Sequence, residues 1–137
     1  NQASILAVQQ VAKDETDKYG IVSLKNKSDN EGFISGIVEK PAPVDAPSTL
    51  AVVGRYILNP RIFHFLENTQ KGAGGEIQLT DAIADLLAEE QVYAYQFEGT
   101  RYDCGSKLGY LQASVELGMK HPEIGNEFKQ YLKTLNN

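Results

Sequence analysis

An acidic and a basic residue stand side by side at the end of a predicted strand. Glu39 and Lys40 follow an apolar run that ends at Val38, and Pro41 comes directly after them. A carboxylate accepts hydrogen bonds from sugar hydroxyls, and an ammonium group neutralises a phosphate as a point charge. Open α/β sheets bind ligands beyond the ends of their strands. The two residues could therefore hold a phosphorylated sugar, although charged residues at a strand end more commonly face water.

This hypothesis sets a condition on the backbone. Neighbouring side chains on a regular strand point to opposite faces of the sheet. Glu39 and Lys40 can meet one ligand only if the strand twists or bulges at Glu39. A proline directly after them favours such an ending, because it cannot donate to the next rung of a sheet.

Two glycines stand where a ligand could approach the backbone closely. Gly20 follows Tyr19, and Gly54 follows Val53 in a long apolar run. A turn glycine and a close-packing glycine are equally good explanations. The functional interpretation is that each leaves room for a bulky ligand, because glycine has no Cβ.

Two further carboxylates stand near predicted helix starts. Glu76 follows Gly74 and Gly75, and Asp103 precedes a glycine–serine pair. Either acid could simply complement the positive end of the helix dipole. Alternatively, Glu76 accepts a sugar hydroxyl, which we favour over an anion bound by the glycine-rich segment. Asp103 could instead bind Mg²⁺, which takes one or two carboxylates together with phosphate oxygens and water.

Cysteine and histidine are too few for several kinds of site. Cys104 is the single cysteine, so an internal disulfide is impossible, and His64 and His121 are the only histidines. This count excludes Cys/His metal clusters and favours a reducing cytoplasm. We do not expect covalent catalysis by Cys104, since no base accompanies it in the sequence. We expect His64 to lie on a helix surface.

Composition indicates one ordinary domain with a real core. The chain has 137 residues, of which 42% are hydrophobic and 23% charged. Its net charge of −5 argues against nucleic-acid and membrane-surface partners, which need a basic face. No apolar run approaches the ~18–20 residues of a spanning helix. The start at Asn1, without a methionine or a basic leader, leads us to expect a piece of a longer protein.

Hydrophobic patterns predict an alternation of strands and helices. Strands are expected over residues 4–8, 19–24, 33–38, 50–58 and 92–97, with the second and third paired antiparallel and the fourth buried and central. Residues 13–18 are expected to form a charged loop. Helices are expected after Asn59–Pro60, over 77–90, after Gly105–Ser106, and after a cap at Asn126. Leu108, Leu111, Val115 and Met119 form one apolar stripe of the third helix. Mixed strands and helices predict a layered α/β domain.

Five short motifs, taken together, resemble one enzyme family. They are Y-G-I-V (19–22), V-E-K-P (38–41), A-V-V-G-R-Y-I-L (51–58), G-E-I-Q-L-T-D-A-I (75–83) and D-C-G-S-K-L-G-Y (103–110). In this order and spacing the chain resembles the C-terminal half of bacterial UTP–glucose-1-phosphate uridylyltransferases. The resemblance covers essentially all 137 residues.

The resemblance implies a fold and a domain. Residues 1–137 would be the sugar-phosphate-side half of a nucleotidyltransferase-type domain, which is Rossmann-like, three-layered and built on a mixed sheet. Helices would occupy residues 106–136. The family's N-terminal nucleotide-binding half, with its glycine-rich phosphate loop, is absent from this sequence. The glycines at 72, 74 and 75 do not replace that loop, since no lysine follows them.

The resemblance also implies roles for single residues. Glu39 would hold glucose hydroxyls, and Lys40 would bind the sugar phosphate and act in catalysis. Gly20 and the backbone of Val53 and Gly54 would line the glucose pocket.

Three more residues receive roles in the same way. Glu76 would be a helix-start residue near the sugar. Lys107 would support the phosphates electrostatically. Asp103 would bind Mg²⁺ beside a second aspartate that this sequence lacks.

The implied reaction joins UTP and glucose 1-phosphate to give UDP-glucose and pyrophosphate, in a cytoplasmic homo-oligomer. The chain alone would be inactive. Three alternatives stay open: a non-catalytic oligomerisation module that uses the amphipathic terminal helix, a sugar-phosphate-binding protein without transfer chemistry, and a nucleotidylyltransferase for another base. The base-reading residues are absent from this sequence, so only the resemblance indicates uridine.

Overall fold

The computed structural model describes residues 3–26, 30–71 and 75–135. They divide into two compact units, Asn1–Phe97 and Glu98–Asn137.

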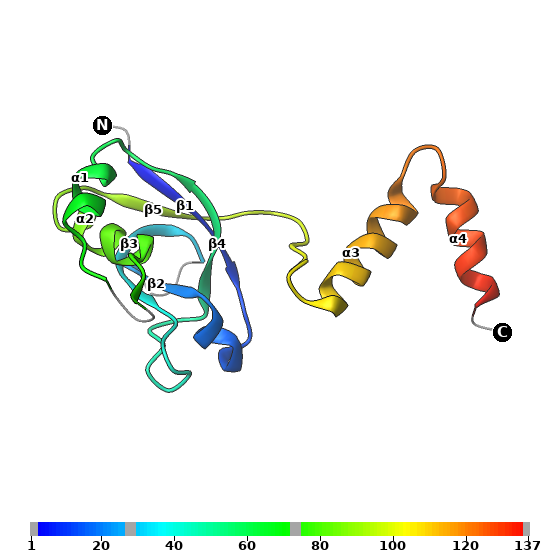
Figure 1. The fold of residues 1–137 in the computed structure, drawn as a ribbon, viewed down its shortest axis with the longest axis horizontal. Helices are drawn as coiled ribbons and strands as arrows, with labels where there is room; N and C mark the ends of the chain where they lie inside the picture. Colours follow the sequence, from blue (N-terminus) through cyan, green and yellow to red (C-terminus); the bar gives the residue numbers. More distant parts are fainter. Residues whose placement is uncertain (1–2, 27–29, 72–74, 136–137) are drawn as a thin grey trace. The chain divides into compact units, whose positions relative to one another are not determined.

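Five strands of the first unit close into a barrel (Figure 1). They are β1 (Ser4–Gln10), β2 (Gly20–Leu24), β3 (Gly32–Glu39), β4 (Leu50–Ile57) and β5 (Val92–Gln96), joined in the order β1-β4-β2-β3-β5. β1 and β5 run parallel, whereas the other pairings are antiparallel. The five predicted strands are therefore confirmed, as are the antiparallel pairing of β2 with β3 and the mixed α/β class.

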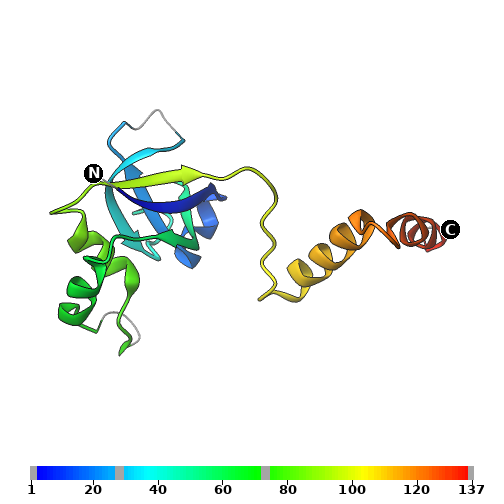
Figure 2. The same cartoon turned by 90° about the horizontal axis from the view of Figure 1, so that it is seen from above.

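Buried aliphatic side chains from the strands fill the barrel and meet two short helices. Those helices are α1 (Ile62–Asn68) and α2 (Leu79–Leu86), which lie together on one flank of the barrel in both views (Figures 1 and 2). The largest fully buried aliphatic residues are Leu6, Val8, Ile21, Val22, Ile34, Ile83, Leu86 and Val92. Burial of Ala82, Ile83 and Leu86 fixes α2 against this core, and α2 also packs on β3.

One strand departs from the prediction. The run over 50–58 was expected to be buried throughout, but β4 is buried only from Leu50 to Val52 and exposed from Gly54 to Ile57. β4 pairs with β2 only at its first two residues, so its second half lacks that neighbour. The β1–β4 register is also irregular there, between Val52 and Tyr56.

One predicted helix begins later than expected, another is shorter, and one predicted loop is helical. α1 begins at Ile62, and the Asn59 side chain accepts the amide of Arg61 at 3.1 Å just before it. α2 covers Leu79–Leu86 rather than 77–90. The charged segment Lys13–Lys18 forms a 3₁₀ helix, η1, because the Thr16 side chain is buried and its hydroxyl bonds the Lys13 carbonyl.

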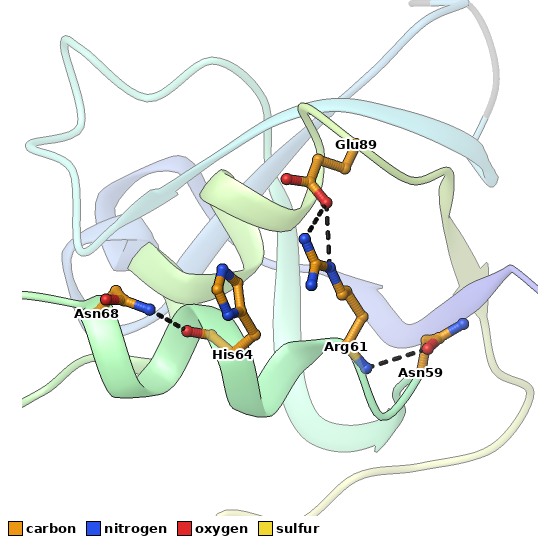
Figure 3. A network of polar contacts seen from close by, with 5 residues as sticks. All are labelled: Asn59, Arg61, His64, Asn68 and Glu89. Atoms are coloured by element: carbon orange, nitrogen blue, oxygen red, sulfur yellow. Dashed lines mark hydrogen bonds and ion pairs between the residues drawn. The ribbon is translucent and has the colours of Figure 1, made fainter.

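A polar network links the start of α1 to the segment after α2 (Figure 3). The guanidinium of Arg61 donates from Nε and Nη2 to Oε2 of Glu89, at 3.1 and 2.9 Å. Farther along α1, the Asn68 side chain donates to the backbone carbonyl of His64. His64 is exposed on α1, as predicted.

The second unit is a pair of helices, α3 (Lys107–Lys120) and α4 (Gly125–Thr134), which pack on each other. A Cβ at Gly118 would lie 2.9 Å from the Phe128 ring, so the close approach of the helices requires glycine there. Ser106 caps α3 as predicted, accepting the Gly109 amide. Asn126 was wrongly predicted to cap α4; the cap residue is Ile124, and Asn126 lies in the first turn.

The predicted apolar stripe of α3 is largely exposed within this unit. Leu108 and Leu111 are 67% and 59% exposed, whereas the buried residues of α3 are Gly109 and Ala113. The buried positions of α3 are therefore occupied by small residues, Gly109 and Ala113. Among the residues described in either unit, no helix is long and apolar enough to cross a membrane.

Candidate functional site

Glu39, the last residue of β3, is held by a side chain from α2. The hydroxyl of Thr80 donates to Oε2 of Glu39 at 2.6 Å. Gly20 lies opposite Glu39 in the β2–β3 register, and it is buried. A Cβ at Gly20 would lie 3.2 Å from Glu39 Oε2 and 3.3 Å from Thr80 Oγ1. The strand end, the first turn of α2 and the start of β2 thus meet at one carboxylate.

Lys40 ends the strand in a left-handed backbone conformation. Its φ of 45° makes it the single non-glycine residue with positive φ in the described part of the chain. Such a conformation is uncommon for a residue with a Cβ and costs about 1–3 kcal/mol. The Lys40 amide donates to the Tyr19 carbonyl at 3.0 Å, and the next residue, Pro41, is buried. These two anchors hold the turn in place.

The position of this turn differs from the prediction. The strand was expected to twist or bulge at Glu39, but the change of direction occurs at Lys40. As a result, Lys40 Nζ lies 3.9 Å from Glu39 Oε1. The lysine side chain is 60% exposed, whereas that of Glu39 is 23% exposed. Such an ion pair contributes little stability, so it does not explain the strained backbone.

The bulge lies instead in β4. Leu6 of β1 pairs with Tyr56 and Val8 pairs with Val52, so three residues, Val53 to Arg55, stand opposite Ala7 alone. Gly54 has a φ of 72° there, and a Cβ would meet nothing within 4 Å. Glycine is therefore needed for its backbone conformation rather than for space. Glycine is needed at the two positions for different reasons. Gly20 leaves room for the side chains of Glu39 and Thr80, and Gly54 permits the backbone conformation of the bulge.

The register places this bulge at the same end of the sheet as Glu39. β2 pairs with β4 at Val22–Leu50 and Ile21–Ala51, so one further step brings Gly20 level with Val52. Gly20 also pairs with Glu39 on its other side. The bulge at Val53 and Gly54 begins one residue beyond that level.

Tyr56 adds a phenol to the surroundings of Glu39. Its pKa is raised, first by burial and then by the negative charge of Glu39. A charge acts on a pKa in this way only at short range. Tyr56 was not predicted as a site residue, because the run over 50–58 was interpreted as a continuous buried strand. Thr80 was not predicted either, although a hydroxyl in the first turn of a predicted helix was visible in the motif G-E-I-Q-L-T-D.

Glu76 precedes α2 by three residues and is exposed. It belongs to the segment that leads into Thr80, after Gly75, whose φ is 76°. The glycines at 72 and 74 lie outside the described residues. In the structure the acid of α2's first turn is Asp81.

Asp103 and Lys107 belong to the second unit. Oδ1 of Asp103 accepts the Gly105 amide at 3.0 Å, and its carbonyl accepts the Ser106 amide at 3.1 Å. A Cβ at Gly109 would lie 2.2 Å from that carbonyl oxygen, so glycine is required for this tight start of α3. The Asp103 side chain thus organises a turn ahead of the helix while its carboxylate stays exposed. Lys107 is the exposed first residue of α3.

The structure therefore brings together Gly20, Glu39 and Lys40, with Thr80 and Tyr56 added. Cys104 is exposed and free. Within the described ranges, no group of three or more His, Cys, Asp or Glu side chains is arranged to hold a metal ion. A hollow of about 440 Å³ lies elsewhere, lined by residues that include Ser23 and Leu24 from the other end of β2. The chemistry of the site comes from the strand ends rather than from that hollow.

Comparison with known proteins matches residues 1–120 to the family described as Nucleotidyl transferase. This chain belongs to the nucleotidyl transferase family. The family accounts for the mixed α/β fold and agrees with the resemblance found from the motifs.

Two curated relatives among the nucleotidyl transferases carry the same enzyme name. A UTP–glucose-1-phosphate uridylyltransferase of Staphylococcus epidermidis is 46% identical over 96% of this chain, which covers 46% of that protein. UTP–glucose-1-phosphate uridylyltransferase 1 of Staphylococcus saprophyticus is 48% identical over 97% of this chain, again covering 46% of that protein. The chain spans about half the length of the curated relatives that it matches.

Solved structures of nucleotidyl transferases agree in fold. A UDP-glucose pyrophosphorylase complexed with UDP-glucose has a TM-score of 0.81 and 46% identity, over 88% of this chain and 46% of that one. A UTP-bound UGPase from Acinetobacter baumannii has a TM-score of 0.82 and 46% identity, over 96% of this chain and 45% of that one. A thymidylyltransferase structure from Bacillus anthracis, at 23% identity and a TM-score of 0.65, shares the fold.

Proposed function

We propose that this chain forms the glucose 1-phosphate side of an enzyme that transfers a uridylyl group from UTP to that sugar phosphate, giving UDP-glucose and pyrophosphate. The family and the names of the similar proteins support this reaction. Because the chain covers less than half of those relatives, we propose that the nucleotide side comes from outside these 137 residues. The chain alone would then not complete the reaction.

The left-handed turn at Lys40 is the observation that carries this proposal. It bends an ammonium group to within 3.9 Å of a carboxylate that α2 already holds, at a backbone cost that surface ion pairing does not offset. Strained backbone that the surrounding structure holds in place is concentrated at ligand sites. An ammonium beside a carboxylate suits a ligand that carries a phosphate next to hydroxyl groups.

We assign the remaining residues around this turn. Glu39 accepts hydrogen bonds from glucose hydroxyls, and Lys40 binds the phosphate. Gly20 and the bulged backbone of Val53 and Gly54 border the sugar. Glu76 accepts a further sugar hydroxyl ahead of α2.

The reaction requires positioning and charge neutralisation. A phosphate oxygen of glucose 1-phosphate attacks the α-phosphorus of UTP, the new O–P bond forms, and the bond to the pyrophosphate leaving group breaks. No covalent enzyme intermediate is needed, which agrees with the absence of a role for Cys104. Lys40 holds the attacking phosphate and offsets its charge in the transition state. Lys107 adds positive charge for the phosphates.

We propose Mg²⁺ as the cofactor, with Asp103 as a ligand. An exposed carboxylate fits the one or two that Mg²⁺ takes beside phosphates, with phosphate oxygens and water as further ligands. The described residues hold no group of three metal-binding side chains, so Asp103 would be this chain's contribution. Bound there, Mg²⁺ would neutralise phosphate charge.

We further propose a cytoplasmic homo-oligomer with no nucleic-acid or membrane partner. The acidic balance of the chain, with a net charge of −5, supports the last two points. The names of the relatives support UTP over other nucleotides.

Pyrophosphate release by the complete polypeptide tests the assignment of Lys40. Lys40→Ala should lower turnover about a hundredfold, since loss of one fixed charge that stabilises a transition state costs ~3 kcal/mol. Lys133→Ala removes an exposed lysine near the end of α4 and serves as the matched control, with turnover unchanged. Equal effects of the two substitutions would overturn the assignment.

A further inference from the structure

The geometry points to Thr80 as a positioning residue that presents Glu39 to the sugar. This inference rests on the proposed function, because it takes Glu39 as the group that binds glucose hydroxyls. It deepens that function by naming the side chain that holds the carboxylate in its binding orientation.

The two carboxylate oxygens of Glu39 have different neighbours. Thr80 Oγ1 donates to Oε2 of Glu39 at 2.6 Å. Oε1 is the oxygen nearer Lys40, at 3.9 Å from Nζ. One oxygen is thus held by α2, and the other is turned toward the lysine that we assign to the phosphate. A hydrogen bond to an ionised acceptor is short and strong, so this contact restricts the carboxylate more than a neutral bond would.

Gly20 leaves room beside the hydrogen bond between Thr80 and Glu39. Gly20 is buried opposite Glu39, and a Cβ there would approach both Glu39 Oε2 and Thr80 Oγ1 at 3.2 and 3.3 Å. No positive φ requires glycine at this position, in contrast to Gly54. The absence of a side chain at Gly20 therefore gives room to the Thr80–Glu39 hydrogen bond itself.

Thr80, the donor of this hydrogen bond, is held on a helix that is fixed by its buried face. Thr80 is the second residue of α2, and the helix is fixed by Ala82, Ile83 and Leu86, which are fully or almost fully buried. A β-branched threonine on a helix has few side-chain rotamers. The donor is therefore preorganised, and the carboxylate is oriented before the sugar binds.

Steady-state kinetics of the complete polypeptide test the inference. Thr80→Val keeps the shape of the side chain and removes the donor. It should raise KM for glucose 1-phosphate about tenfold, the loss expected for one hydrogen bond to a charged group. KM for UTP and kcat should stay within about twofold, because Glu39 would hold hydroxyls equally in the ground and transition states. Thr80→Ser retains the donor and should restore KM to near the wild-type value.

Two further variants distinguish a failure of the proposed sugar site from a failure of the role assigned to Thr80. In a Glu39→Ala background, Thr80→Val should add no further increase in KM, because no carboxylate is left to orient. Thr69→Val is the matched control: its hydroxyl donates to the Phe65 carbonyl at the end of α1, and its loss should leave KM unchanged.

Each outcome has one meaning. If Glu39→Ala leaves KM for glucose 1-phosphate unchanged, the proposed sugar site fails, and the role of Thr80 fails with it. If Glu39→Ala raises KM but Thr80→Val does not, the inference about Thr80 alone is overturned. Equal effects of Thr80→Val and Thr80→Ser, or a parallel rise in KM for UTP, would assign Thr80 to helix packing and also overturn it.

Discussion

At the scale of single residues, the acid–base pair at the end of β3 works through one strained backbone position. Glu39 and Lys40 are neighbours in sequence, so a regular strand would separate their side chains. The φ of 45° at Lys40 removes that separation. The sequence allowed the pair to be singled out, because a charged couple before a proline is visible in V-E-K-P. It also predicted that the backbone must turn at Glu39, whereas the structure turns at Lys40.

Two neighbours of this pair could not be found from sequence alone. Thr80 reaches Glu39 across 41 positions of the chain, and Tyr56 reaches it electrostatically from another strand. Long-range pairings of this kind depend on the register of the folded sheet. The motif that contains Thr80 marked the segment as relevant without identifying the hydroxyl.

Tyr56 provides a pH-dependent prediction. Its raised pKa means that the folded protein keeps the phenolic proton at pH values where the unfolded chain loses it. The resulting stability is fully present below the unfolded value of about 10 and is lost as the pH rises through the folded pKa. The free energy of unfolding, measured in urea from pH 9 to 11.5, should therefore fall more steeply for the wild type than for Tyr56→Phe.

Glu39→Gln supplies the internal control for this measurement. It removes the smaller cause of the raised pKa and leaves burial, so its loss of stability should be intermediate. Parallel curves for the wild type and Tyr56→Phe would contradict a raised pKa of Tyr56, and identical curves for the wild type and Glu39→Gln would contradict the contribution of Glu39.

At the scale of elements, α2 is the part that brings Thr80 to β3. Its apolar spacing predicted a helix, because Leu79, Ile83 and Leu86 lie on one face. Its predicted ends, at 77 and 90, were wrong, since the helix begins at Leu79 and the residues beyond Leu86 continue in turns. The Arg61–Glu89 ion pair, which joins the start of α1 to the segment after α2, is about half exposed and should contribute less than about 1 kcal/mol. Burial of the apolar face must then hold α2 in place.

Truncating a buried side chain of that face should lower the free energy of unfolding. Ile83 is 1% exposed, so Ile83→Ala should lower the free energy of unfolding by about 2–5 kcal/mol through lost burial and a cavity. Ile77, just before α2, is 52% exposed, and Ile77→Ala should cost less than about 1 kcal/mol. Urea denaturation of the two variants measures both values. A small loss for Ile83→Ala would show that α2 is not fixed by its core face.

At the scale of the whole molecule, the sequence predicted which segments are strands but not how they close. The parallel pairing of β1 with β5 joins Ser4 to Val92, and hydrophobic patterns carry no information on such distant partners. The same limit explains the error in β4, whose exposed half looks like core in the sequence. Apolarity predicts burial only where neighbouring elements are present to cover it.

Residues with proposed roles occur in both units. Glu39, Lys40 and their neighbours belong to the first unit, whereas Asp103 and Lys107 belong to the second. Each group is organised locally: the first by the turn at Lys40, and the second by the turn that Asp103 forms ahead of α3. The proposed reaction also needs a nucleotide-binding part outside these residues.

The most direct test of the account is a crystal structure of the complete polypeptide with glucose 1-phosphate. We expect a phosphate oxygen within hydrogen-bond distance, ~2.7–3.1 Å, of Lys40 Nζ, and a glucose hydroxyl at the same range from Glu39, with the Thr80 contact retained. A sugar phosphate bound elsewhere, with Glu39 and Lys40 facing solvent, would contradict the central claim that this strand end recognises the phosphorylated sugar.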